Sequence, residues 1–197
     1  ERLSVRARWV LDCTGRAGLL ARRGWRRSEP GGRTMAIAAV WEQRNSWNLA
    51  DPSHTLVESY GGGWAWSVPV SPTRRHVTVM VDPALTNVAG RQRLAATYRA
   101  ELAGTTTMRA LVERARMVGA PFARDASSFH AERHGRDGLL LVGDAASFVD
   151  PLSSYGVKKA LASAWLAAVV THSCLQKPPL LLPALALYES RERAIYD

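Results

Sequence analysis

The chain has 197 residues, of which 47% are hydrophobic, so it can bury one large core or two small ones. No run reaches the roughly 18 to 20 consecutive apolar residues of a transmembrane helix, and the first residues lack a signal-peptide pattern. We therefore expect a cytoplasmic protein without a membrane span. The net charge is +9, but the basic residues are almost all scattered arginines, which argues against nucleic acid as a partner and leaves a solvated basic face or an anionic ligand.

The first elements are expected to be a strand and a turn. An apolar strand precedes Asp12, a turn follows at Thr14-Gly15, and a short segment ends at Gly24. An acid and a glycine at the carboxyl end of a strand are typical of the edge where open α/β sheets bind ligands. The composition of residues 25–32 indicates a linker. Turn signals then separate four β-like runs, which predicts a mainly antiparallel sheet from residues 34–43, 54–60, 63–70 and 76–82.

A helical period replaces the β pattern in residues 87–104 and 105–119, with Thr105, Thr106 or Thr107 as the candidate cap of the second helix. A returning strand and a loop are expected in residues 120–138. The C-terminal part is then predicted to contain a strand at 139–142, an alanine-rich helix at about 156–174, and a last helix after Pro178, Pro179 and Pro183. An α/β part, residues 1–24 and 120–197, is therefore interrupted by a β-sheet part with helices at 25–119.

Residues 138–161, "GLLLVGDAASFVDPLSSYGVKKAL", combine a buried strand with an acid at its end. Asp144 cannot fill a core unpaired, so it faces water, a cation or a hydroxyl-bearing ligand, with Gly143 allowing close approach of the backbone. The alternative is that Asp144 caps a helix. The helix that begins at Gly156 offers free amides to an anion or to an electron-rich ring edge. Together these features predict a cradle for an elongated, hydroxyl-bearing, negatively charged cofactor.

This segment closely resembles the second FAD-binding motif of flavin-dependent monooxygenases and halogenases of the p-hydroxybenzoate-hydroxylase type. Residues 10–18, "VLDCTGRAG", resemble the D-A-T-G-R segment of the same families. The resemblance implies FAD as the cofactor, with Asp144 on its ribityl chain and with Asp12 and Gly15 near it. The flavin contacts that it implies are Gly143, Asp144, Pro151, Tyr155, Gly156 and Val157.

The resemblance also implies a fold. Residues 1–24 and 120–197 would form the C-terminal portion of an FAD-binding Rossmann-like domain of α/β class, and residues 25–119 an inserted, mainly antiparallel β-sheet substrate domain that covers the ligand. The G-x-G-x-x-G motif that comes first in these families is absent from the sequence. We therefore expect the chain to be a piece of a longer protein and inactive on its own.

A narrower resemblance lies in residues 62–70, "GGWAWSVPV", which are similar to the W-x-W-x-I-P signature of flavin-dependent halogenases. Trp64 and Trp66, two apart on a strand, would line one surface, where the family's pair is thought to separate flavin from substrate. The alternative is that they pack a sheet against helices. Ser153 stands where tryptophan halogenases carry a glutamate, which argues against tryptophan as the substrate. Lys158 and Lys159 are interpreted as surface charges.

We therefore expect an FAD-dependent oxidoreductase, a halogenase-like monooxygenase that acts through a flavin hydroperoxide on an aromatic or otherwise electron-rich substrate. Its expected partners are O₂, a separate flavin reductase, and a small-molecule substrate that is anionic or carrier-tethered. The alternatives are a flavin-dependent halogenase proper, an isoprenoid-chain reductase, and a non-catalytic basic binding module. No metal is expected, because only His130 and His134 approach a metal-binding spacing and they lie in a loop-like segment.

Overall fold

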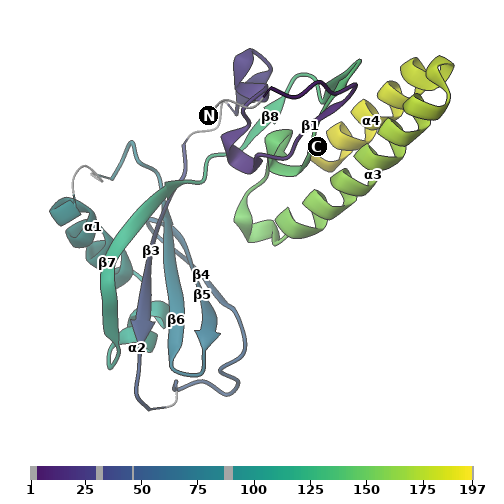
Figure 1. Ribbon diagram of the computed structural model, residues 1–197. Coiled ribbons are helices and arrows are strands. Elements are labelled where there is room, and N and C mark those ends of the chain that lie inside the picture. Colours follow the sequence, from purple (N-terminus) through teal and green to yellow (C-terminus); the bar gives the residue numbers. More distant parts are fainter. Residues whose placement is uncertain (1–3, 30–32, 46, 87–90, 197) are drawn as a thin grey trace. The chain divides into compact units, whose positions relative to one another are not determined.

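The computed structural model describes residues 4–29, 33–45, 47–86 and 91–196. The chain folds into two compact units, one made of Glu1–Pro30 and Ser127–Asp197 and the other of Gly31–Ala126 (Figure 1). The expected boundaries, after residues 24 and 119, lie too early in both places. Residues beyond 24 pair within the first unit, and the strand that contains residue 119 continues to Asp125 within the second.

The first unit contains two small sheets. Strand β1 (Val10–Asp12) pairs in parallel with β10 (Leu139–Leu141), which pairs with the antiparallel β9 (Gly135–Arg136). The second sheet is antiparallel and has the order β11-β8-β2, formed by β2 (Arg26–Ser28), β8 (Phe129–Ala131) and β11 (Ser147–Phe148). The expected linker at 25–32 therefore contains a strand, whose partner β8 is too distant in sequence for a local pattern to reveal.

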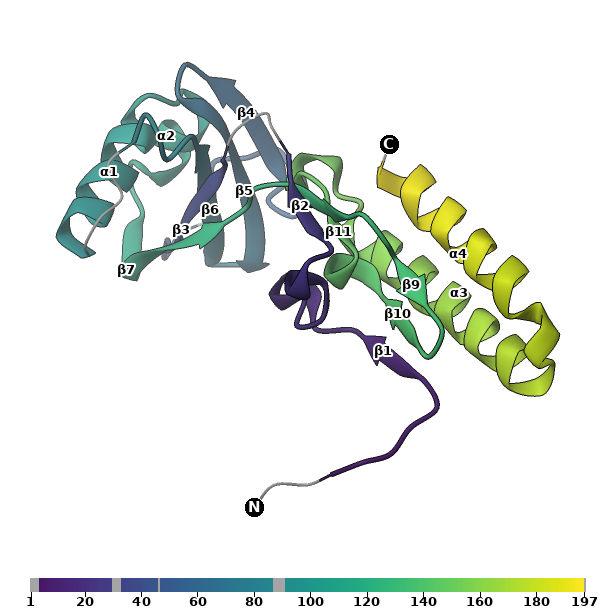
Figure 2. The same ribbon diagram turned by 90° about the horizontal axis from the view of Figure 1, so that it is seen from above.

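Two long helices complete the first unit. Helices α3 (Gly156–Gln176) and α4 (Leu181–Tyr196) lie side by side in both views (Figures 1 and 2). One stripe of α3 packs with Leu140, Val142 and Tyr188 into a core. Short 3-10 segments connect these elements, namely η1 (Gly15–Ala17), η2 (Ala21–Arg23), η3 (Gly143–Ala145), η4 (Pro151–Ser153) and η5 (Pro178–Leu180). No helix in the part of the chain that the structure describes is long and apolar enough to cross a membrane.

The second unit is a five-stranded antiparallel sheet with the order β4-β5-β6-β3-β7. Its strands are β3 (Met35–Glu42), β4 (Leu56–Tyr60), β5 (Gly63–Ser71), β6 (Arg74–Val81) and β7 (Arg116–Asp125). Alternate residues such as Ala65 and Val79 are fully buried with Tyr98 of α1 (Arg91–Ala103) and Met108 of α2 (Thr107–Val112), so the two helices pack on one face of the sheet. The predicted combination of an α/β part with a mainly antiparallel sheet is confirmed.

Helix α2 is shorter than predicted. The sequence pattern extended it to residue 119, but it ends at Val112, and β7 begins at Arg116. Gly119 has a φ of +76°, and the pairing of β3 with β7 shifts register between Ala38 and Val40. A bulge in the strand thus accounts for the positive φ of Gly119.

A carboxylate from β4 caps α2 together with one of the expected threonines, Thr105, whose hydroxyl accepts from the N–H of Arg109 at 3.1 Å. Thr106 occupies the N-cap position without a side-chain cap, and Glu58 instead accepts hydrogen bonds from the backbone N–H groups of Thr106, Thr107 and Met108 at 2.5, 2.9 and 3.0 Å. Burial of the Glu58 carboxylate would raise its pKa, but these three donors outweigh that effect, and the pKa lies below its ordinary value.

Replacing Glu58 with Gln is expected to lower the free energy of unfolding of the full-length protein by about 1–2 kcal/mol near neutral pH. Because the pKa is depressed in the folded state, this stabilisation is present above the unfolded-state pKa and is lost as pH falls through the folded-state pKa. Urea unfolding at neutral pH and at about pH 3 measures both effects. The control is Glu113→Gln, at the C-terminal end of α2. A Glu58→Gln deficit that does not shrink in acid would contradict the capping role.

Candidate functional site

The two sequence motifs of the first unit meet at one edge of its parallel strands. Asp12 of β1 pairs with Leu141 of β10, and the N–H of Val142 donates to the carbonyl of Asp12 at 3.0 Å. Both strands therefore end at the same edge, and η1 packs against η3 there. This edge, the carboxyl end of parallel strands, is where open α/β sheets bind ligands.

Asp12 orders the loop that follows it. Its carboxylate accepts hydrogen bonds from the N–H and hydroxyl of Thr14 at 3.1 and 2.5 Å and from the N–H of Leu20 at 2.8 Å. Burial raises the pKa of Asp12, but these donors outweigh it and the pKa is lowered. Asp12 is only 3% exposed, and its hydrogen bonds shape the turn around Gly15. Gly15 has a φ of +61°, and no neighbouring atom lies within 4 Å of the position a Cβ would take, so its backbone borders open space.

Gly143 is fixed by the helix packed against it. Its φ is +60°, and an added Cβ would lie 3.2 Å from the Cβ and 3.3 Å from the Cα of Ala160 on α3. Its N–H donates to the hydroxyl of Ser163 at 2.9 Å. Glycine is therefore required both by the backbone conformation and by the closeness of the helix.

Asp144 lies inside η3 with its side chain 31% exposed. The N-cap of η3 is Val142 and that of α3 is Tyr155, so the alternative interpretation of Asp144 as a helix cap is wrong. Its carboxylate lies 3.6 Å from the amino group of Lys159. A partly exposed carboxylate beside a fixed cation remains available to accept hydrogen bonds from a hydroxyl-bearing ligand.

Lys159 was interpreted as a surface charge, and this is wrong, because the residue is 0% exposed. Its amino group donates to the carbonyl of Gly143 at 3.2 Å, to the hydroxyl of Ser147 at 3.1 Å and to the carbonyl of Ser147. Burial lowers the pKa of Lys159, and the negative charge of Asp144 opposes that shift. The sequence did contain the signal, since position 159 begins the buried stripe Lys159, Ser163, Ala167, Val170 and Cys174 of α3. Lys158 is exposed as expected, with its amino group 5.2 Å from the centre of the Tyr155 ring.

The loop before α3 is held by Asp150, whose carboxylate accepts from the N–H of Leu152 at 2.8 Å. Pro151 and Tyr155 are half-buried, whereas Val157 is 76% exposed in the first turn of α3. The start of α3 carries no side-chain cap, and no neighbouring atom lies within 4 Å of a Cβ position at Gly156. The first amides of a long helix are thus available to a ligand.

The tryptophan pair belongs to the second unit. Trp64 and Trp66 lie on one face of β5, half-buried, with ring centres 5.9 Å apart in an edge-to-face arrangement. Ala65 between them is buried with α1 and α2 on the opposite face. The pair therefore does not pack the sheet against these helices, which excludes that alternative. The indole N–H of Trp66 is buried without a hydrogen-bond partner in the described ranges.

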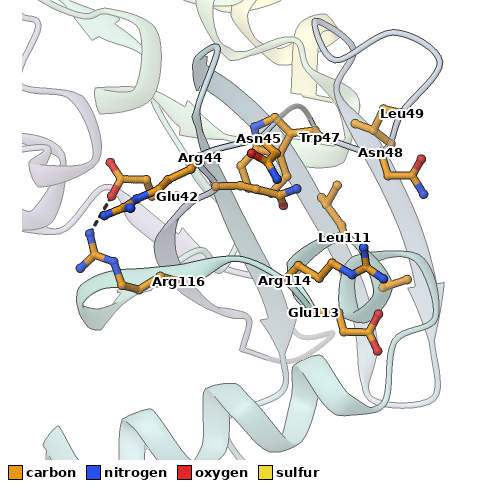
Figure 3. Close-up of a pocket in the computed structure, with 12 residues that line it drawn as sticks. Glu42, Arg44, Asn45, Trp47, Asn48, Leu49, Leu111, Glu113, Arg114 and Arg116 are labelled. Atoms are coloured by element: carbon orange, nitrogen blue, oxygen red, sulfur yellow. Dashed lines mark hydrogen bonds and ion pairs between the residues drawn. The ribbon is translucent and has the colours of Figure 1, made fainter.

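A cavity of about 1010 Å³ lies elsewhere in the second unit (Figure 3). It is bordered by the segment after β3 and by the C-terminal end of α2, and no residue of the sequence motifs lines it. Arg44 and Arg114 border the cavity, while Arg116 pairs with Glu42 at 2.6 Å. Two histidines of the first unit have acidic partners, His130 with Glu29 and His134 with Glu189, each at 3.0 Å.

Comparison with known proteins decides the family. The model of the tryptophan halogenase family matches residues 2–178. The chain belongs to the tryptophan halogenase family. Within this family, the matched residues include both motifs at the sheet edge and the tryptophan pair.

Two curated relatives and one solved structure illustrate the family resemblance. The flavin-dependent halogenase armH4 of Armillaria mellea is 25% identical over 100% of this chain and 40% of its own length. The 1H-pyrrole-2-carbonyl-[peptidyl-carrier protein] chlorinase of Pseudomonas fluorescens is 29% identical over 84% of this chain and 38% of its own. The crystal structure of CmlS, a flavin-dependent halogenase, superposes with a TM-score of 0.89 at 25% identity, covering 95% of this chain and 34% of that one. The chain thus spans about 40% of the length of such relatives.

Replacing Gly143 with Ala is expected to lower the free energy of unfolding by about 1–3 kcal/mol, because the Cβ adds strain at positive φ and crowds Ala160. Gly156→Ala is the matched control, since its Cβ would enter open space, and we expect a change within about 0.5 kcal/mol. Denaturant unfolding of the flavin-free full-length protein measures both. Equal losses in the two variants would disprove the packing role of Gly143.

Proposed function

We propose that the chain forms part of an FAD-dependent, halogenase-like oxidoreductase that acts on an aromatic or otherwise electron-rich small molecule. The observation that carries this proposal is the parallel pairing of β1 with β10, which brings the turns at Gly15 and Gly143 to one sheet edge. Membership of the tryptophan halogenase family supports it. Family membership also favours this function over an isoprenoid-chain reductase or a non-catalytic binding module.

The residues at this edge fit a flavin dinucleotide. The backbone at Gly15 and Gly156 borders open space, the Asp144 carboxylate is partly exposed, and the first amides of α3 carry no side-chain cap. The open backbone positions allow a ligand to approach closely, the Asp144 carboxylate suits a polyhydroxyl chain, and the amides of α3 suit an electron-rich ring edge. When bound and reduced, FAD supplies the electrons for activation of O₂, which leads either to oxygen transfer or to oxidation of a halide.

In this proposal each residue has a defined task. Asp144 accepts hydrogen bonds from the ribityl hydroxyls, and the amides of Gly156 and Val157 face the flavin ring, which Pro151 and Tyr155 border. Gly143 lets the turn pack closely against α3. Asp12 acts indirectly, by ordering the loop around Gly15. The tasks of Trp64 and Trp66 are to border the substrate and to keep water away from the reacting atoms.

The substrate is a small molecule, and the name of the Pseudomonas fluorescens relative supports one tethered to a carrier protein. We propose that a separate flavin reductase supplies the reduced flavin and that O₂ is the oxidant. The absence of a glutamate at Ser153 favours a substrate other than free tryptophan. We propose halogenation as the reaction, because curated relatives that cover most of this chain are halogenases, with oxygen transfer as the alternative.

The full-length protein as purified, or after addition of FAD, is expected to show a flavin absorption spectrum and to release FAD on denaturation. Asp144→Ala should lower the affinity for FAD about tenfold or more, because hydrogen bonds to a charged acceptor are lost. The matched control is Asp137→Ala, which removes an exposed carboxylate from the same unit. Fluorescence titration with FAD measures the affinity, and circular dichroism verifies the fold. Equal affinities of Asp144→Ala and wild type would remove the ribityl assignment.

Replacing Trp66 with Leu is expected to lower the yield of halogenated product per O₂ consumed by about tenfold and to raise the release of hydrogen peroxide, because water gains access to the reacting atoms. Product analysis with bromide or chloride and a peroxide assay measure the two yields. Trp165→Leu, at a site on α3 that is 70% exposed, is the control and should leave both unchanged. Unchanged yields in Trp66→Leu would assign that indole to packing alone.

A further inference from the structure

A cluster of buried polar side chains lies directly beneath the turn at Gly143 and Asp144. Lys159 of α3 and Tyr188 and Glu192 of α4 are each 0% exposed, and Ser163 is 1% exposed. Tyr188 and Glu192 lie beyond residue 178, where the family match ends. Such a concentration of polar groups in a core is costly unless each group is paired, so it calls for a physical explanation.

The cluster fixes the backbone of the turn at several points. The amino group of Lys159 donates to the carbonyls of Gly143 and Ser147 and to the Ser147 hydroxyl. The Tyr188 hydroxyl donates to the carbonyl of Leu141 at 2.7 Å and lies 3.2 Å from the Ser163 hydroxyl, which in turn accepts from the N–H of Gly143. Side chains of both helices therefore hold the segment from residue 141 to residue 147.

Two acidic residues influence the charge of Lys159, and one of them, Asp144, is partly exposed. Lys159 forms an ion pair with the partly exposed Asp144 at 3.6 Å, whereas the charge of the buried Glu192 acts on it from beyond ion-pair distance. Both carboxylate oxygens of Glu192 are buried, and the Ser163 hydroxyl lies near them. Burial raises the pKa of Glu192 and lowers that of Lys159, and the opposite charge of each residue counteracts the shift of the other. Asp144 is thus the ion-pair partner of Lys159, and Glu192 is a second buried acidic group in the cluster.

We propose that Lys159 is a positioning residue that holds the turn in the form that presents Asp144 to the flavin. This inference rests on the proposed function and extends it to the polar cluster beneath the turn. Without the lysine, the Gly143 and Ser147 carbonyls lose their donor and the Asp144 carboxylate loses its neighbouring cation. Without Glu192, the lysine is buried with Asp144 as its remaining acidic neighbour.

Four variants of the full-length protein test this role: Lys159→Met, Glu192→Met, the double variant, and Lys177→Met as a control for loss of an exposed lysine at the end of the same helix. The melting temperature without flavin and the dissociation constant for FAD are measured for each. Lys159→Met should melt at a lower temperature, because the turn loses the donor to its carbonyls, and Glu192→Met should melt at a lower temperature, because the buried lysine keeps Asp144 as its remaining acidic neighbour. The double variant should recover most of the lost temperature, because apolar side chains of similar volume replace two buried titratable groups.

The affinity for FAD should not follow this recovery. We expect Lys159→Met and the double variant both to bind FAD about tenfold more weakly than wild type, because in both the carbonyls of the turn lack their donor. Lys177→Met should match wild type in both measurements. If the double variant recovers affinity together with melting temperature, the pair is only structural and the inference is wrong. If the Lys159→Met variant binds FAD as tightly as the wild type, only this inference fails, whereas a wild type that binds no FAD would overturn the proposed function as well.

Discussion

The parallel pairing of β1 with β10 is the constraint on which the candidate site depends. It joins the start of the chain to a strand far along the sequence and forces Asp12 and Gly143 to leave the sheet at the same edge. Either turn alone would be a common feature of α/β proteins. Because parallel strands carry their carboxyl ends in one direction, their loops converge, and α3, which begins after η3, β11 and η4, packs against η3 near its first turns.

Much of this arrangement could be predicted from the sequence, because local patterns determine it. The strand at 139–142 was recognisable by its continuous apolar run, the strands of the inserted sheet by their period and turns, and α3 by its small residues. The failures are non-local or irregular. Strand β2 exists only because β8 pairs with it, and the start of β7 resembled a helix because a bulge at Gly119 interrupts its strand period.

The site was predicted less completely than the fold. The sequence placed both Asp144 and Asp12 at the cofactor, yet the Asp12 carboxylate accepts hydrogen bonds from its own loop, while Asp144 is partly exposed. The helical period would have placed Lys159 on the buried stripe, but the general rule that lysine is exposed was given more weight. Alternation showed that Trp64 and Trp66 share a face without revealing which face α1 and α2 would cover.

A buried lysine beneath a binding turn adds little stability, because the free-energy cost of desolvating it offsets most of the gain from its ion pair with Asp144. Its effect on geometry is different in kind. A single ammonium group that contacts two carbonyls and a hydroxyl leaves the turn few alternative conformations, whereas an apolar side chain of equal volume would fill the space without selecting one. A loop that must present one carboxylate to a ligand benefits from that selectivity more than from additional stability. The polar cluster beneath Gly143 is therefore better explained by its effect on the conformation of the turn than by its effect on the stability of the core.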